Sequence, residues 1–216
     1  MKNYFLFFTT CLFLTTITSY SQSFEEISIP NVTTTLSASR SANFVDVNGD
    51  GWDDIFFSNG KSGGQNNMLY INNTDGTFTT VNSGAIVTDN SRSVGSSFAD
   101  ADNDGDLDLF VTTWDSGAAG KNYFYRNNGD GSFNYESAIA MGSDLTFSEM
   151  ATWIDYNNDR QIDMFMAKCS GTTDLGRRRN ELYRNNGDGT FTEVSAALGL
   201  SDIGCGLAIT ATDYDL

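Results

Sequence analysis

Residues 44–57 read Phe-Val-Asp-Val-Asn-Gly-Asp-Gly-Trp-Asp-Asp-Ile-Phe-Phe. The pattern returns at residues 98–111 as Phe-Ala-Asp-Ala-Asp-Asn-Asp-Gly-Asp-Leu-Asp-Leu-Phe-Val, and at 153–166 as Trp-Ile-Asp-Tyr-Asn-Asn-Asp-Arg-Gln-Ile-Asp-Met-Phe-Met. A fourth copy begins at Asp213, so the first aspartates of successive copies are 54, 55 and 58 residues apart. A period of this kind indicates a fold built from stacked copies of one structural unit.

A second element with the same period lies between these copies. It occupies residues 67–78, 122–133 and 180–191, and it combines a tyrosine with an Asn-Asn segment, an Asp-Gly turn and a closing Phe. Each unit therefore predicts four strands. The first ends before the first Asp, the second starts at the last Asp, the third carries the Tyr, and the fourth follows the Asp-Gly turn, which is a strong hairpin signal.

The second strand of each unit is apolar without alternation, as in Ile55–Phe57, which means that both of its faces are covered. A small sheet stacked between neighbouring sheets is a β-propeller blade. We predict an all-β fold, a partial β-propeller of about three and a half four-stranded blades. Residues 23–28 resemble residues 190–195 and are expected to form the outer strand of a blade whose other three strands lie in the missing C-terminal part, so that the ring closes by overlap of the two chain ends. The predicted units span about residues 29–82, 83–137, 138–196 and, truncated, 197–216.

Composition excludes several classes of function. The chain has 12 basic and 28 acidic residues, a formal net charge of −16, and no histidine. Nucleic acid and anionic membrane surfaces would be repelled by this charge. Catalytic mechanisms and metal sites that depend on histidine are excluded from the chain.

The two ends of the chain indicate export and truncation. Lys2 precedes an apolar run over residues 4–14, and small residues stand before Gln22, so we predict a cleaved signal peptide over residues 1–21. The apolar run is shorter than the roughly 20 residues of a membrane anchor, which predicts no membrane insertion. We expect a secreted protein, extracellular or at the cell surface. The chain ends at Leu216 inside the fourth copy and is interpreted as an N-terminal fragment.

Export leaves Cys169 and Cys205 as the only cysteines of the mature chain, residues 22–216. An oxidising compartment allows them to pair, but two separately buried thiols fit the sequence equally well.

The aspartate loops have the donor pattern of a hard-cation site. Side-chain oxygens recur at positions 1, 3, 5 and 9 of the motif, and a glycine at position 6 lets the carbonyl of position 7 turn inward, which suits Ca²⁺. Position 12, where an EF-hand needs an acid, is Phe57, Val111 or Met166. Of the 28 acidic residues, 14 lie in these loops, where they would repel one another without a cation. The alternative is a set of solvated turns without an ion.

These loops, the Asn-x-Leu-Tyr-Arg-Asn-Asn-Gly-Asp-Gly-Thr-Phe element and the signal peptide resemble the FG-GAP or VCBS repeat family of secreted calcium-binding β-propellers. Cartilage acidic protein and its bacterial relatives belong to this family, and integrin α-chain propellers are more distant members. The resemblance covers residues 24–216 and implies seven blades with Ca²⁺ bound between the first two strands of a blade.

The resemblance implies three sets of ligands and the start of a fourth. The third set is the weakest, because Arg160 replaces the turn glycine and Asn157 lowers the ligand charge. The predicted ligands are Asp46, Asn48, Asp50, Trp52 (carbonyl) and Asp54; Asp100, Asp102, Asp104, Asp106 (carbonyl) and Asp108; Asp155, Asn157, Asp159, Gln161 (carbonyl) and Asp163; and, in the truncated copy, Asp213 and Asp215.

A non-enzymatic binding or adhesion module is the favoured function. The Asp-Gly-Thr-Phe turn lacks the leading Ser of a sialidase box, and every close carboxylate pair lies in a loop already explained by metal. The alternative is an ancillary or substrate-binding propeller of a larger extracellular polysaccharide-active enzyme, with its catalytic residues beyond Leu216. A protein or glycan ligand is expected on the face opposite the calcium loops, where the connection ending in Arg177–Arg179 lies.

Overall fold

The computed structural model describes residues 25–60, 62–114, 121–139, 141, 147–169, 179–200 and 204–212. These residues form three four-stranded antiparallel sheets, each with its strands in chain order from one edge to the other. The prediction of an all-β chain with the blades of a partial β-propeller is confirmed. The strands are β1 Ser39–Val45, β2 Asp54–Asn59, β3 Met68–Asn72 and β4 Phe78–Val81; β5 Ser93–Ala99, β6 Asp108–Thr113, β7 Tyr123–Asn127 and β8 Phe133–Tyr135; and β9 Ser148–Ile154, β10 Asp163–Lys168, β11 Glu181–Asn185 and β12 Phe191–Glu193.

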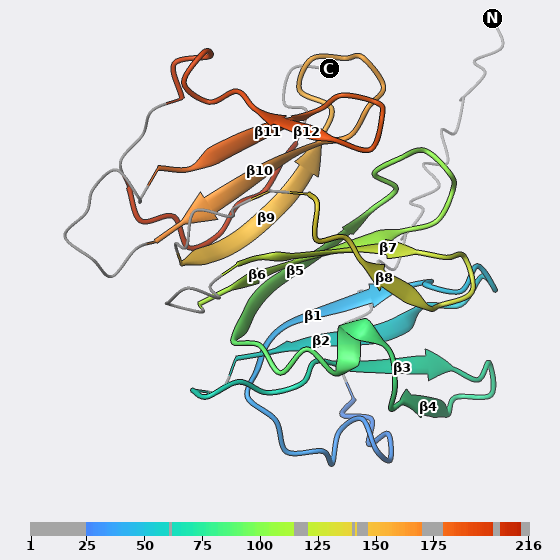
Figure 1. Ribbon diagram of the computed structural model, residues 1–216. Helices are drawn as coiled ribbons and strands as arrows, with labels where there is room; N and C mark the ends of the chain where they lie inside the picture. Colours follow the sequence, from blue (N-terminus) through green and yellow to red (C-terminus); the bar gives the residue numbers. More distant parts are fainter. Residues whose placement is uncertain are drawn as a thin grey trace, which may run out of the picture.

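The three sheets stack face to face, with the β5–β8 sheet in the middle (Figure 1). The first strands of the sheets are neighbours, because β5 contacts both β1 and β9. This is the order expected when the first strand of each blade lies innermost and the fourth lies at the outside of a fan.

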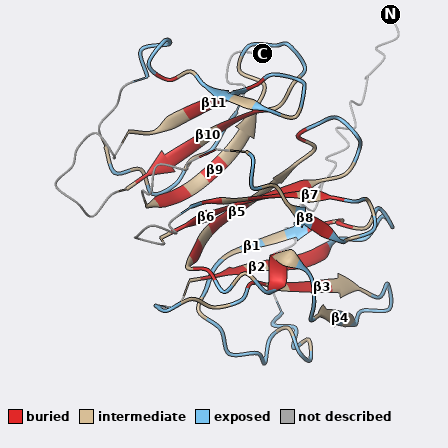
Figure 2. Ribbon diagram, viewed as in Figure 1, coloured by how far each residue is buried: buried red, intermediate tan, exposed pale blue. Residues whose placement is uncertain are grey.

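Two apolar clusters fill the spaces between the sheets. Residues of β6 contribute to both, since Leu109 and Val111 pack with Phe56 of the first sheet while Phe110 packs with Met164 of the third. Every residue of β6 is buried (Figure 2). The absence of alternation in this strand is therefore explained by apolar neighbours on both of its faces.

Some details differ from the sequence-based expectation. One turn of 3-10 helix, Ala85–Val87, precedes β5, and its Ile86 and Val87 are buried in the cluster between the first two sheets. Residues 25–28 lie in no strand, and the strands that they were predicted to join are not among the described residues, so that outer strand stays a prediction. Residues 204–212 likewise contain no assigned strand, although the Gly206 amide donates to the Lys168 carbonyl at 3.3 Å.

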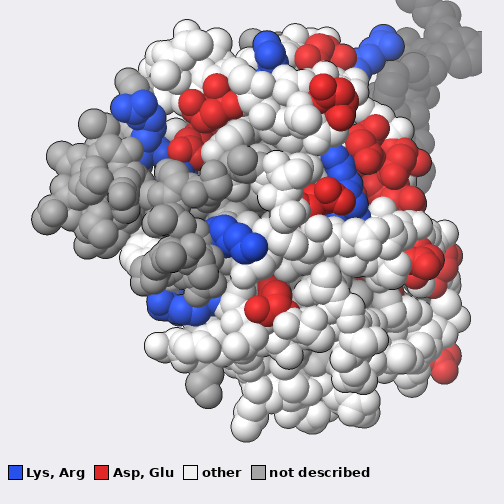
Figure 3. Space-filling model, in the orientation of Figure 1, with Lys and Arg blue, Asp and Glu red and all other residues white. Residues whose placement is uncertain are grey.

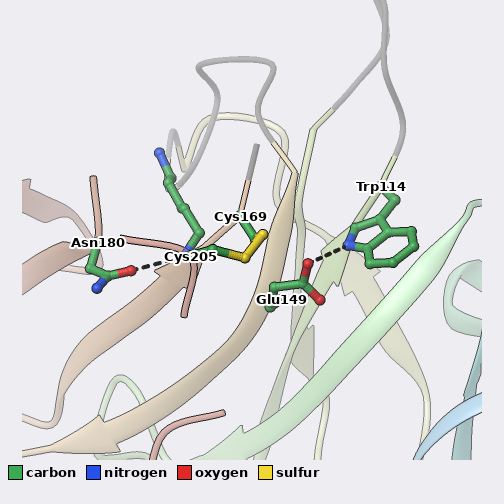
Figure 4. Close-up of a disulfide and its surroundings, with 6 residues drawn as sticks. Trp114, Glu149, Cys169, Asn180 and Cys205 are labelled. Atoms are coloured by element: carbon green, nitrogen blue, oxygen red, sulfur yellow. Dashed lines mark hydrogen bonds between the residues drawn. A yellow bond between two sulfur atoms is a disulfide. The ribbon is translucent and has the colours of Figure 1, made fainter. Parts of the chain in front are cut away.

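A disulfide joins Cys169, directly after β10, to Cys205, with their Cα atoms 4.3 Å apart (Figure 4). Of the two alternatives that the sequence left open, the structure has the bonded one, which ties the segment after the third sheet to the end of β10. Within the described ranges, no helix has the length and apolar character needed to cross a membrane. The predicted signal peptide, residues 1–21, lies outside the described residues.

Candidate metal centres

The three complete aspartate loops connect the first and second strands of their sheets in the same register. Each loop is closed by a pair between the last residue of the first strand and the aspartate at motif position 9, as in Val45 with Asp54. Contacts between sheets place the loops along one rim. The Asn127 side chain donates to the Val47 carbonyl at 2.8 Å, and Asn103 donates to Gln161 at 2.9 Å.

The first loop is organised around the carboxylate of Asp46. This carboxylate accepts backbone N–H groups from Gly49 at 2.8 Å, Asp50 at 3.2 Å and Gly51 at 2.7 Å. The Asp50 carboxylate in turn accepts the Trp52 amide at 2.9 Å and the Asn48 side-chain amide at 3.2 Å. The sequence-predicted ligands are thus held side by side by the backbone of their own loop.

The third loop follows the same path although Arg160 stands where the other loops have glycine. Arg160 adopts φ 69°, in the left-handed region, and its amide donates to Asp155 at 2.9 Å. Asp159 also donates to Asp155, at 3.1 Å, and accepts from the Asn157 side chain at 2.8 Å. The predicted weakness of this loop therefore lies in backbone strain and in the charge of Arg160, since the hydrogen bonds match those of the first loop.

The second loop brings three carboxylates together. One oxygen from each of Asp100, Asp102 and Asp104 lies within 4.8 Å of the other two. Two ligands of one Ca²⁺, each at about 2.3–2.6 Å, stand at most about 5 Å apart, so this spacing fits a shared cation. Arg126 of β7 also reaches this loop, with Nη1 3.2 Å from Asp102 and in a closer ion pair with Asp108.

The aspartates at position 9 are the buried anchors of the loops. Asp54, Asp108 and Asp163 are between 0% and 1% exposed. Burial raises the pKa of all three carboxyls, that of Asp108 to about 6, against the opposing effect of backbone hydrogen bonds. A charge that is costly to bury favours a neighbouring cation.

A repeated asparagine at the end of the third strand connects each anchor to the rest of the fold. The backbone amides of Asn72, Asn127 and Asn185 donate to the anchor aspartates at 2.8–3.0 Å. In the second and third sheets the side chain also donates across to the preceding sheet, from Asn127 to Val47 and from Asn185 to Ala101, both at 2.8 Å. Each loop is therefore part of the contact between neighbouring sheets.

The residues present fit a hard divalent cation. Each complete loop offers only oxygen donors, with three carboxylates in the first and third loops and four in the second, as Ca²⁺ prefers. Among the described residues, one trio of carboxylates, that of Asp100, Asp102 and Asp104, has the spacing of ligands to a shared cation. Asp213 and Asp215 lie outside the described residues.

Sequence reasoning missed the roles of Arg126 and of the repeated asparagine. Both belong to the Tyr-Arg-Asn-Asn element, from which the sequence predicts only the third strand and the turn that follows it. The available signal was the recurrence of the asparagine 18, 19 and 22 residues after the last aspartate of the three complete loops, but the sequence does not show that the third strand passes beneath the loop.

A family profile described as FG-GAP-like repeat matches residues 46–111, 100–166 and 155–216. Each match begins at the first aspartate of a loop, and the first two run into the second strand of the next unit. The chain belongs to the FG-GAP-like repeat family. These repeats form propeller blades and are compatible with an interaction or adhesion module. No curated protein matches the chain.

Proposed function

We propose that this FG-GAP-like repeat chain is a secreted, non-catalytic β-propeller module, stabilised by Ca²⁺ in its aspartate loops, that binds a protein or glycan ligand on the opposite rim. The observation that carries the proposal is the common scaffold of the three loops. In each, the first carboxylate accepts the amides of positions 5 and 6, and the last is buried beneath it, as with Asp46 and Asp54. A solvated turn has no need for a buried carboxylate.

Ca²⁺ would be held by the side-chain oxygens at positions 1, 3, 5 and 9 and the carbonyl at position 7 of each loop. Its contribution is charge neutralisation, which removes the repulsion among carboxylates and the cost of burying the last one. The loop joins the two inner strands of a blade and contacts the next blade through Asn127 or Asn185, so an ion there supports the stack of sheets.

The opposite rim carries several basic side chains. Figure 3 shows clusters of Asp and Glu toward its right edge, and toward its left edge Lys and Arg side chains beside a smaller group of Asp and Glu. Arg40, Lys121 and Arg179 lie at or just before the starts of β1, β7 and β11, at the ends of these strands remote from the aspartate loops. Arg40 lies over the Trp114 ring at 5.1 Å, and Trp114 donates to the buried Glu149 at 3.1 Å.

These contacts present cationic and aromatic groups on that rim, a combination suited to an acidic protein or an anionic glycan. Arg177 and Arg178, the other members of the predicted arginine cluster, lie outside the described residues.

Thermal unfolding of the secreted protein tests the calcium part of the proposal. Extracellular calcium modules bind at about 10⁻⁴ to 10⁻³ M, so millimolar Ca²⁺ should raise the melting temperature above that in chelator. Mg²⁺ at the same concentration should raise it less, because it demands octahedral geometry and keeps its waters. Identical melting temperatures in calcium and chelator would contradict the proposal.

A further inference from the structure

Arg126 places a positive charge inside the second aspartate loop. Its guanidinium pairs with Asp102 and Asp108, and its side chain is 14% exposed. The guanidinium also lies 4.8 Å from the centre of the Phe124 ring, which fixes its approach. Two of the four carboxylates that the second loop offers to calcium are therefore already paired with a cation that belongs to the protein.

The equivalent positions in the other two sheets behave differently. Ile71 of β3 is uncharged and packs against the apolar cluster between the first two sheets. Arg184 of β11 is exposed and hydrogen-bonds Asn186 at 3.4 Å, and no ion pair within the described residues joins it to the third loop. Arg184 and Arg126 occupy equivalent positions and have side chains of the same length, yet among the described residues only Arg126 pairs with the carboxylates of its loop. The length of the side chain therefore does not explain the contact.

The difference between the loops lies at motif position 3. The second loop has Asp102 there, whereas the first and third have Asn48 and Asn157. The second loop thus has four ligand carboxylates against three in each of the others. The single charge of Arg126 offsets the fourth ligand carboxylate, so the ligand carboxylates of the second loop together with Arg126 carry the same formal charge as the three ligand carboxylates of each other loop.

We propose that Arg126 is a tethered counter-ion of the second loop that competes with a divalent cation for Asp102 and Asp108. This inference rests on the proposed calcium binding, and it means that carboxylate number alone overstates the calcium affinity of the second loop, which binds calcium more weakly than it would without Arg126. A cavity of about 460 Å³ lies beside the guanidinium and is lined by Glu136 and Thr190 among others. It offers an acidic partner to the guanidinium when calcium displaces it.

The three loops can be observed separately in the full chain by NMR. The amide of Gly51 donates to Asp46 at 2.7 Å, that of Gly105 to Asp100 at 3.1 Å, and that of Arg160 to Asp155 at 2.9 Å. Because each amide is bonded to the first ligand of its own loop, its chemical shift in a calcium titration reports that loop alone. The test compares wild type with Arg126→Gln, which keeps a hydrogen-bond donor but removes the charge, and with the matched control Arg184→Gln.

Arg126→Gln should lower the calcium concentration at the Gly105 midpoint by about tenfold or more, since a unit charge a few ångströms from a divalent ion is repelled even at the dielectric constant of water. The Gly51 and Arg160 midpoints should stay unchanged, and Arg184→Gln should change none of the three. A Gly105 midpoint that is the same in Arg126→Gln and wild type would overturn the proposal.

Two further measurements keep the test decisive. If Arg126→Gln does not fold, the comparison is made in a second background, between Asp102→Asn alone and Asp102→Asn with Arg126→Gln. Loss of Arg126 should again lower the calcium concentration at the Gly105 midpoint, because Asp108 loses its tethered cation, and equal midpoints in the two variants overturn the proposal. If calcium shifts none of the three amide resonances in any variant, the proposed calcium binding is refuted. The counter-ion role is then read in chelator, where Arg126→Gln should lower the melting temperature more than Arg184→Gln, and equal shifts would exclude it.

Discussion

Asn127 links the second sheet to the first through its side chain, and Asn127→Ala measures that link. The side-chain amide donates to the carbonyls of Val47 at 2.8 Å and Leu107 at 3.2 Å, and its oxygen accepts the Gly129 amide at 3.0 Å. The residue is 6% exposed. Truncation removes three hydrogen bonds, one buried and two part-buried, worth about 1 kcal/mol each, so the variant should lose about 3 kcal/mol of unfolding free energy.

Asn72→Ala is the matched control, because Asn72 occupies the same place in the first sheet. Its side chain donates only to the Asp53 carbonyl, at 3.0 Å in an exposed position, and accepts the Thr74 amide at 2.9 Å. Both alanine variants keep the backbone hydrogen bond to the anchor aspartate. Asn72→Ala should cost about 1 kcal/mol, because exposed hydrogen bonds are partly replaced by water.

Urea unfolding of the two variants gives the comparison directly. The expected difference of about 2 kcal/mol corresponds to a difference in melting temperature of roughly 4–8 °C for a chain of this size. Equal losses in Asn127→Ala and Asn72→Ala would refute the claim that this asparagine joins neighbouring sheets at the loops.

Three further outcomes are expected. Burial raises the pKa of Asp89 above its unfolded value of 3.8, so the protonated carboxyl contributes its full stability below that value and loses it as the pH rises through the higher folded pKa. Asp89→Asn should therefore gain stability relative to wild type as the pH rises above 3.8, and a pH-independent difference in urea unfolding would contradict this. Arg160→Gly removes left-handed strain and a positive charge, so calorimetry should show an apo-protein stabilised by about 1 kcal/mol and tighter calcium binding; unchanged apo stability would count against the strain, and unchanged affinity against the effect of the charge. Replacing Cys169 and Cys205 by serine opens a 36-residue link and should cost about 2–4 kcal/mol in non-reducing unfolding experiments, whereas no loss would show that the bond does not constrain the unfolded chain.

The architecture could be predicted from the sequence because each copy of the repeat independently indicates the same four strands. The apolar run Leu109–Val111 predicted a strand covered on both faces, and the structure buries its residues between two neighbouring sheets. The Asp-Gly turn predicted the last hairpin, which appears between β7 and β8. These features are local or periodic, and such signals are the ones that a single sequence carries.

The features that could not be predicted from the sequence depend on contacts between segments that are far apart along the chain. Arg126 enters the second loop because β7 passes beneath it and Asp102 supplies a second carboxylate, and neither fact follows from the spacing along the chain. The similarity of residues 23–28 to residues 190–195 predicts a strand, but a strand needs a partner edge, and none of the described sheets offers one to residues 25–28, so this prediction stays open. The sequence likewise could not show whether Cys169 and Cys205 pair, because a disulfide depends on the distance between their Cα atoms in the fold, which is 4.3 Å.

A crystal structure of the protein grown with millimolar Ca²⁺ tests the central claim most directly, through the anomalous signal of calcium. The account predicts peaks in the loops that begin at Asp46 and Asp155, each surrounded by the named side-chain oxygens at about 2.3–2.6 Å. In the loop that begins at Asp100 it predicts a peak only where Arg126 has left Asp102 and Asp108. Loops closed by their own hydrogen bonds, with no peak in any of them at saturating calcium, would contradict it.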